Sequence, residues 1–143
     1  MSIKAINKSN KLSTYCTFKS LLEPERYISV ISNRKLLTAL AKFRCSNHTL
    51  SIEYGRSKNI DITERTCYYC QSIGIQIIED EYHFLCKCPL YSNLRDRILP
   101  LMVKPTYFEF VTIMCSKEDV MINAVAKYVF LALIERSKLL LEN

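Results

Sequence analysis

Three cysteines and one histidine lie close together near the middle of this 143-residue chain and constrain its fold more than any other feature. In chain order they are Cys67, Cys70, His83 and Cys88. Thiolates and a neutral imidazole are the donors that Zn²⁺ prefers in tetrahedral structural sites, and a two-residue spacing lets one tight turn present both sulfurs. Because four donors fill the coordination sphere, the pattern predicts a zinc ion that stabilises the fold and does not catalyse.

Cys86 leaves the identity of the fourth ligand open. Two residues separate His83 from Cys86 and four separate it from Cys88, and either spacing can close a tetrahedron. We favour Cys88, because it directly precedes Pro89 at an expected helix start, where unpaired backbone amides stabilise a thiolate. Cys86 stands at a position that is typical of a packing residue.

The seven cysteines of the chain also raise the alternative of a secreted, disulfide-linked scaffold. The number is odd, no secretion signal is visible, and the other three cysteines, Cys16, Cys45 and Cys115, lie apart from one another. No apolar run approaches the roughly 20 residues of a membrane span. We therefore favour zinc over disulfides and expect an intracellular protein, in the nucleus or the cytoplasm, without a membrane partner.

The composition predicts a mainly α fold, since hydrophobic residues make up 49% of the chain and glycines number only two. Apolar periodicity and capping residues predict helices at 33–44, 48–54, 89–100, 107–115 and from about 118 to 141. Asn33 is the expected N-cap of the first helix, and Gly55 the left-handed C-cap of the second. We assign the apolar residues of the long C-terminal helix to the core.

The zinc element is expected at about residues 64–92, as an insertion in a helical domain of residues 31–143. Its β-branched run at 72–80 predicts a short β-hairpin. Glu79, Asp80 and Glu81 are expected to form the exposed start of a helix that carries His83. Residues 1–30 are interpreted as a basic segment, either mobile or the broken end of something longer.

Catalytic motifs are missing from the sequence. A zinc deaminase requires a glutamate two residues after its histidine, and Leu85 occupies that position here. The other histidine, His48, has no acid or nucleophile placed beside it by a motif, so we interpret it as a packing residue. With two glycines the chain has no phosphate-binding loop, and we expect no enzymatic activity.

The formal charge of +6 is compatible with a polyanionic partner, and basic residues precede the first zinc ligand. The residues expected to contact phosphates are Lys42, Arg44, Arg56, Lys58 and Arg65. Tyr68 and Tyr69 are candidates for stacking on unpaired bases. The alternative is that the cations form a solvated face and the tyrosines shield the zinc ion.

Several of these segments together resemble the region after the reverse transcriptase domain in non-LTR (LINE-type) retrotransposon polyproteins. The resemblance covers about residues 31–140 and rests on AKFRCSNHTLSIEYGR, ERTCYYC, DEYHFLCKCPLYSNLR, FEFVTIMCS and INAVAKYVFLALIERS. It implies a Cys/Cys/His/Cys zinc site with Cys88 as the fourth ligand and an apolar role for Cys86. It also implies an appendage that binds RNA or DNA beside a polymerase, and no polymerase motif is found in this chain.

The sequence therefore predicts a zinc-stabilised, non-catalytic nucleic-acid-binding module, a remnant that is either a truncated copy or a small stand-alone gene. The alternative function is a zinc-braced helical module that binds a protein partner through its C-terminal helix and does not bind nucleic acid. A third alternative is an unselected fragment without a cellular role.

Overall fold

The computed structural model describes residues 25–99 and 105–142, and in these ranges the chain is mainly helical and contains no strand. Most of the segment predicted at residues 1–30 therefore lies outside the described residues, and residues 26–30 form the first described helix. The α-helices are α2 (Arg26–Val30), α3 (Arg34–Arg44), α4 (Ser51–Ser57), α5 (Tyr68–Ser72), α6 (Ser92–Ile98), α7 (Tyr107–Met114) and α8 (Asp119–Leu141). The short elements are the 3₁₀ turns η1 (Ile62–Glu64) and η3 (Pro89–Tyr91) and the π-helix η2 (His83–Lys87).

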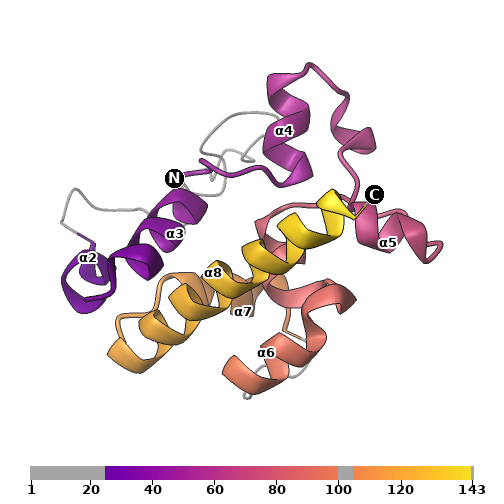
Figure 1. Cartoon of the computed structure of the whole chain (residues 1–143). Helices are drawn as coiled ribbons and strands as arrows, with labels where there is room; N and C mark the ends of the chain where they lie inside the picture. Colours follow the sequence, from indigo (N-terminus) through magenta and orange to yellow (C-terminus); the bar gives the residue numbers. More distant parts are fainter. Residues whose placement is uncertain (1–24, 100–104, 143) are drawn as a thin grey trace.

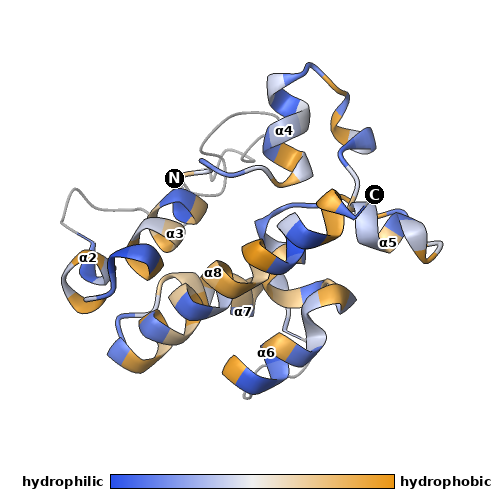
Figure 2. Cartoon of the chain, in the orientation of Figure 1, coloured by the Kyte–Doolittle hydropathy of each residue, from blue (hydrophilic) through white to orange (hydrophobic). Residues whose placement is uncertain are grey.

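The 23-residue helix α8 is the centre of the molecule (Figure 1). It packs most extensively against α3, and then against α6, α2 and α7. Its buried apolar residues are Ile122, Val125, Ala126, Tyr128, Val129 and Ala132. Figure 2 shows apolar and polar residues alternating along this helix, as a partly buried helix requires. The prediction that the apolar residues of this helix form core is confirmed for Val125, Tyr128, Val129 and Ala132, whereas Ile134 is partly exposed and Leu141 is exposed. No described helix is long and apolar enough to cross a membrane.

The helix starts follow the capping chemistry of the sequence. The Asn33 side chain accepts hydrogen bonds from the backbone N–H groups of Lys35 at 2.9 Å and Leu36 at 3.2 Å, which confirms its predicted role as N-cap. The helix predicted at 107–115 is α7, whose N-cap Thr106 accepts from the backbone of Glu109. The helix predicted at 89–100 is divided into η3 and α6, and residue 100 lies outside the described ranges.

Gly55 does not end a helix, and its predicted role as a C-cap is wrong. It lies inside α4, which continues to Ser57, and the one described glycine with a positive φ is Gly74. A Cβ on Gly55 would lie 2.4 Å from Cγ of Arg65. The residue is therefore glycine because the aliphatic stem of Arg65 crosses α4 at this point.

The predicted β-hairpin and inserted zinc knuckle are not supported. Helix α5 extends to Ser72, and the pairing is limited to one isolated antiparallel bridge between Thr66 and Ile78. In the described part of the chain no further extended segment pairs with these two. An isolated pair of extended segments has marginal stability in water. The three cysteines of the cluster are buried in the same core as residues of α3 and α8, so nothing in the described residues separates this region from the helices around it.

The contact between Gly55 and Arg65 predicts the effect of a single methyl group. Gly55→Ala is expected to destabilise the fold by about 1–3 kcal/mol, because the new Cβ would overpack against the arginine stem. Urea denaturation of the metal-loaded protein measures this change.

An Arg65→Ala background provides the control for this prediction. Without the arginine stem the same Gly55→Ala change removes a helix-interior glycine and is expected to be neutral or stabilising by up to about 1 kcal/mol. An equal loss of stability in both backgrounds would contradict the steric explanation.

Candidate metal centre

The ligand atoms of Cys67, Cys70, His83 and Cys88 all lie within 4.8 Å of one another. Sγ of Cys67 is 3.9 Å from Sγ of Cys88, and Sγ of Cys70 is 3.5 Å from Nε2 of His83. Tetrahedral Zn–S bonds of about 2.3 Å and Zn–N bonds of about 2.0 Å separate two sulfurs by about 3.8 Å, and a sulfur from a nitrogen by about 3.5 Å. The four residues thus form a cluster that could hold one metal ion, and its spacing fits a tetrahedral ion.

Helix α5 positions the first two cysteines. Cys67 is its N-cap, and Cys70 follows within the first turn, so both sulfurs point to the same side. The backbone N–H of Cys67 donates to the carbonyl of Ile77 at 2.8 Å, and that of Ile75 donates to the carbonyl of Cys70 at 2.8 Å. The loop after α5 is thereby folded back on the cysteine pair.

The π-helix η2 positions the other two ligands. The backbone N–H of Cys88 donates to the carbonyl of His83 at 2.8 Å, which is the five-residue hydrogen bond of a π turn. This bond brings the two ends of the turn next to each other, although four residues separate them in sequence. Pro89 then begins η3, where a residue without a backbone N–H is tolerated.

Cys86 is not a member of the cluster. It is 3% exposed and belongs to the hydrophobic core, where burial raises the pKa of its thiol to about 12. The described cysteines form no disulfide, and the structure brings Cys88 and not Cys86 beside the other three donors.

The electrostatics of the cluster favour a cation. A hydrogen bond from the Cys88 thiol, together with contacts from His83, lowers the pKa of Cys67 to about 4. Burial and the neighbouring Cys67 thiolate raise the pKa of Cys70 to about 11, and the bond that Cys88 donates to Cys67 raises the pKa of Cys88. One thiolate is therefore stable without a metal, whereas three thiolates require a cation that displaces the remaining protons.

All four candidate ligands are between 1% and 3% exposed. Nδ1 of His83 is also buried, and within residues 25–99 and 105–142 it has no hydrogen-bond partner. The imidazole ring of His83 is therefore held by packing and by the contact of its Nε2 with Sγ of Cys70. A buried set of four donors has no position for a substrate and matches a closed, structural metal site.

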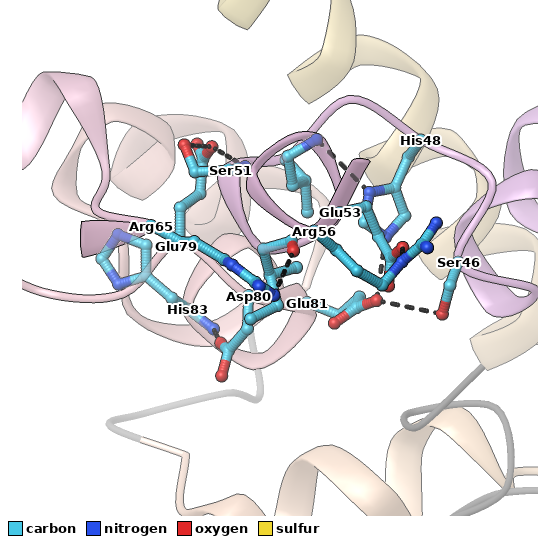
Figure 3. A network of polar contacts seen from close by, with 12 residues as sticks. Ser46, His48, Ser51, Glu53, Arg56, Arg65, Glu79, Asp80, Glu81 and His83 are labelled. Atoms are coloured by element: carbon cyan, nitrogen blue, oxygen red, sulfur yellow. Dashed lines mark hydrogen bonds and ion pairs between the residues drawn. The ribbon is translucent and has the colours of Figure 1, made fainter. Parts of the chain in front are cut away.

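Three consecutive carboxylates fix the segment that carries His83, and the prediction that they are exposed is wrong. Glu79, Asp80 and Glu81 are 3%, 7% and 2% exposed. Oδ1 of Asp80 accepts a hydrogen bond from the backbone N–H of His83 at 2.8 Å (Figure 3). This bond satisfies the first amide of the π-helix and holds the backbone of the ligand.

Glu79 forms the strongest of these contacts. It accepts two hydrogen bonds from the guanidinium of Arg136 on α8, at 3.0 and 2.7 Å. Its Oε1 also accepts from the backbone N–H and the hydroxyl of Ser51, at 2.8 and 2.9 Å. Glu79 therefore ties the ligand segment to the start of α4 and to the central helix.

Glu81 accepts from Nε2 of His48 at 2.8 Å and from the hydroxyl of Ser46 at 3.5 Å (Figure 3). Nδ1 of His48 accepts from the backbone N–H of Leu50 at 3.3 Å, so the proton of the neutral ring lies on Nε2 and points to Glu81. His48 thus has the packing role that the sequence indicated, with a carboxylate partner that the sequence did not reveal.

These carboxylates are the functional residues that sequence reasoning missed. A signal was present in α8, where Arg136 continues the buried row of Val125, Val129 and Ala132 at helical spacing. A charged residue in a buried helical row requires a partner of opposite charge. Sequence alone does not identify that partner, because Glu79 is 57 residues away.

The predicted phosphate-contacting residues have different environments. Arg44 is buried and donates to Glu25 and to the carbonyl of Met114. Arg65 is buried and donates to the carbonyls of Ile52 and Ile60. These two guanidinium groups bind other parts of the chain, which removes them from the exposed surface.

The other candidates for nucleic-acid contact are at least partly exposed. Arg56 is half-buried and pairs with Glu53 at 2.8 Å. Lys42 and Lys58 are exposed, and the Lys58 ammonium lies over the ring of Tyr54. Tyr68 is 44% exposed and Tyr69 is half-buried.

Comparisons with known proteins provide no identification. No protein-family model matches the chain, and searches of curated proteins and of solved structures find no match. The resemblance to a retrotransposon region therefore stays a prediction.

The cluster geometry predicts opposite behaviour for two neighbouring cysteines. Cys88→Ala removes one of four donors and is expected to reduce the bound metal strongly, whereas Cys86→Ala is expected to retain one ion per chain. Metal analysis of the purified variants measures both. Loss of metal from the Cys86 variant with retention in the Cys88 variant would contradict the cluster.

The ion pair between Glu79 and Arg136 predicts a large stability effect. Arg136→Met leaves a buried carboxylate without its main partner and is expected to cost about 3–5 kcal/mol. The exposed pair of Arg26 and Asp119, whose side chains are 51% and 60% exposed, provides the matched control, and Arg26→Met is expected to cost less than about 1 kcal/mol. Urea denaturation of the metal-loaded variants tests both values, and similar costs would contradict a special role for Glu79.

Proposed function

We propose that this chain is a zinc-stabilised, non-catalytic module that binds nucleic acid. The observation that carries the nucleic-acid part is the distribution of charge. The described interior contains four arginines, Arg44, Arg65, Arg95 and Arg136, and four carboxylates, Glu53, Glu79, Asp80 and Glu81. These charges balance, so the formal excess of +6 comes from residues outside this interior, +2 of it from described residues and +4 from residues outside the described ranges, and an excess of this sign attracts a polyanion.

The donor set supports zinc as the metal. Three thiolates and one imidazole at tetrahedral separations match structural zinc, and the burial of all four residues supports a site that stabilises rather than catalyses. In this proposal zinc supplies the charge that allows three neighbouring thiolates to coexist. The metal then links α5 to the π-helix η2 and stabilises the helical domain around them.

Nucleic-acid contacts are proposed for the exposed members of the predicted set, which are Lys42, Lys58 and Tyr68. Lysines supply charge to phosphates, and an exposed tyrosine offers a ring face to an unpaired base. Arg44 and Arg65 are proposed to stabilise the fold and not to contact nucleic acid, because their guanidinium groups bind Glu25 and backbone carbonyls. The resemblance to the region after a reverse transcriptase domain supports the same function, and on that ground we propose that the chain is a remnant of such a region.

A salt series with and without metal tests this function. The zinc-loaded protein is expected to bind single-stranded RNA, single-stranded DNA or a duplex with an affinity that falls as salt rises, because bound phosphates release counterions. Fluorescence anisotropy with labelled oligonucleotides measures the affinity. A chelator and Cys88→Ala are expected to remove the binding, and Cys86→Ala is expected to retain it. Absence of salt-sensitive binding by the zinc-loaded protein would exclude the function.

A second candidate function is protein binding, which the loop after α5 favours. Ile73, Ile75 and Ile77 are 49%, 48% and 38% exposed, and apolar side chains gathered on one loop are typical of a contact surface. The central part of α8 is less suited to this role than the sequence indicated, since Tyr128 and Val129 are fully buried in the core. Replacing Lys42 and Lys58 by glutamine distinguishes the functions, because only nucleic-acid binding depends on these charges.

A further inference from the structure

Helices α6 and α8 together form a hollow of about 330 Å³ that is open to solvent. Arg97 and Ile98 line it from α6, and Asn123, Ala124 and Lys127 line it from α8. Two cations from two different helices thus border one space, and none of the described residues that line it is acidic. Half-buried Ile98 and Ala124 supply apolar surface between the charged groups.

Arg97 differs from most other described arginines because it makes no hydrogen bond or ion pair within residues 25–99 and 105–142. Lys127 likewise has no such partner there. By contrast, six arginines donate to a carboxylate or a backbone carbonyl, namely Arg26, Arg44, Arg56, Arg65, Arg95 and Arg136. The N–H groups of the Arg97 guanidinium are therefore available to a ligand.

The chemistry of the lining favours phosphate. A guanidinium presents two parallel N–H donors to a phosphate, and an ammonium adds a second positive charge. The Asn123 amide donates to the carbonyl of Asp119 at 2.9 Å, which fixes its orientation at the edge of the hollow. The volume lies at the lower end of the range of ligand pockets and suits one nucleotide unit rather than a larger ligand.

The metal centre fixes the position of this hollow. Arg95, two residues before Arg97, is buried and donates to the carbonyl of Cys88 at 2.9 Å and to that of Leu85 at 3.0 Å. It also contacts the hydroxyl of Tyr128 on α8 at 3.5 Å. The Arg95 guanidinium therefore holds α6 against residues 85–88, which include the candidate ligand Cys88, and against the central helix α8.

We propose that the hollow between α6 and α8 binds the phosphates of a polynucleotide through Arg97 and Lys127. This inference rests on the proposed function and adds to it a site that the sequence-based set of basic residues did not contain. The metal centre orients the site through Arg95, so phosphate binding at the hollow depends on the folded metal centre.

A double variant of the zinc-loaded full chain tests the site. Arg97→Gln with Lys127→Gln is compared with Arg34→Gln and Lys35→Gln, a matched pair of exposed residues on α3 that loses the same charge. Anisotropy with single-stranded RNA over a salt series is expected to show at least about a tenfold loss of affinity for the hollow variant. The slope of the logarithm of affinity against the logarithm of salt concentration is expected to become shallower by about 1.4. This change corresponds to the loss of two contacts with phosphates of a single strand. The control pair is expected to lose less than about threefold.

The possible outcomes separate this inference from the proposed function. If wild-type protein binds RNA and both double variants weaken it equally, the hollow is not the site, although the proposed function stands. If wild-type protein shows no salt-sensitive binding, both the proposed function and the phosphate site at the hollow are excluded. A titration with adenosine monophosphate, followed by NMR of the Arg97 and Lys127 signals, addresses the ligand source. Binding of the mononucleotide as tight as that of the RNA would overturn the assignment to a polynucleotide.

Discussion

The buried ion pair between Glu79 and Arg136 holds residues 79–88, which carry the candidate ligands His83 and Cys88, on the central helix α8. Removing two charges from water is costly, and the cost is offset only where the geometry satisfies both groups. Here two parallel hydrogen bonds join the carboxylate to the guanidinium, and Ser51 adds two more donors. Because α8 packs against α2, α3, α6 and α7, this pair connects the local geometry of the ligands to nearly every described α-helix.

The metal cluster depends on this connection because its own side chains repel one another when they ionise. The surroundings lower the pKa of Cys67 and raise the pKa values of Cys70 and Cys88, so ionisation of all three thiols together needs a cation. The π turn between His83 and Cys88 brings the ligands into place, and Asp80 satisfies the first amide of that turn. A bound cation would compensate the charge of the cluster, and the carboxylates hold the backbone that presents the donors.

Spacing and periodicity predicted the parts of the structure that depend on local sequence. The ligand quartet follows from donor chemistry at short separations, and helices α3, α7 and α8 follow from apolar periodicity and caps. The hairpin prediction failed because isoleucine favours strands only where another surface covers it, and Ile73, Ile75 and Ile77 remain exposed. Gly55 and Glu79 were misread because their partners, Arg65 and Arg136, are brought near only by the tertiary fold. The same holds for Glu81, whose partners are His48 and Ser46.

The arginines of this chain belong to two groups that sequence alone does not distinguish. Arg65 and Arg95 each donate to two backbone carbonyls, Arg65 to those of Ile52 and Ile60 and Arg95 to those of Leu85 and Cys88. A lysine at either position would keep the charge but would lack the planar fork that bonds two carbonyls at once. These two buried positions therefore depend on the geometry of a guanidinium, whereas an exposed cation contributes mainly its charge. Each buried guanidinium thus ties its own segment to a backbone carbonyl 13 or 10 residues earlier in the chain.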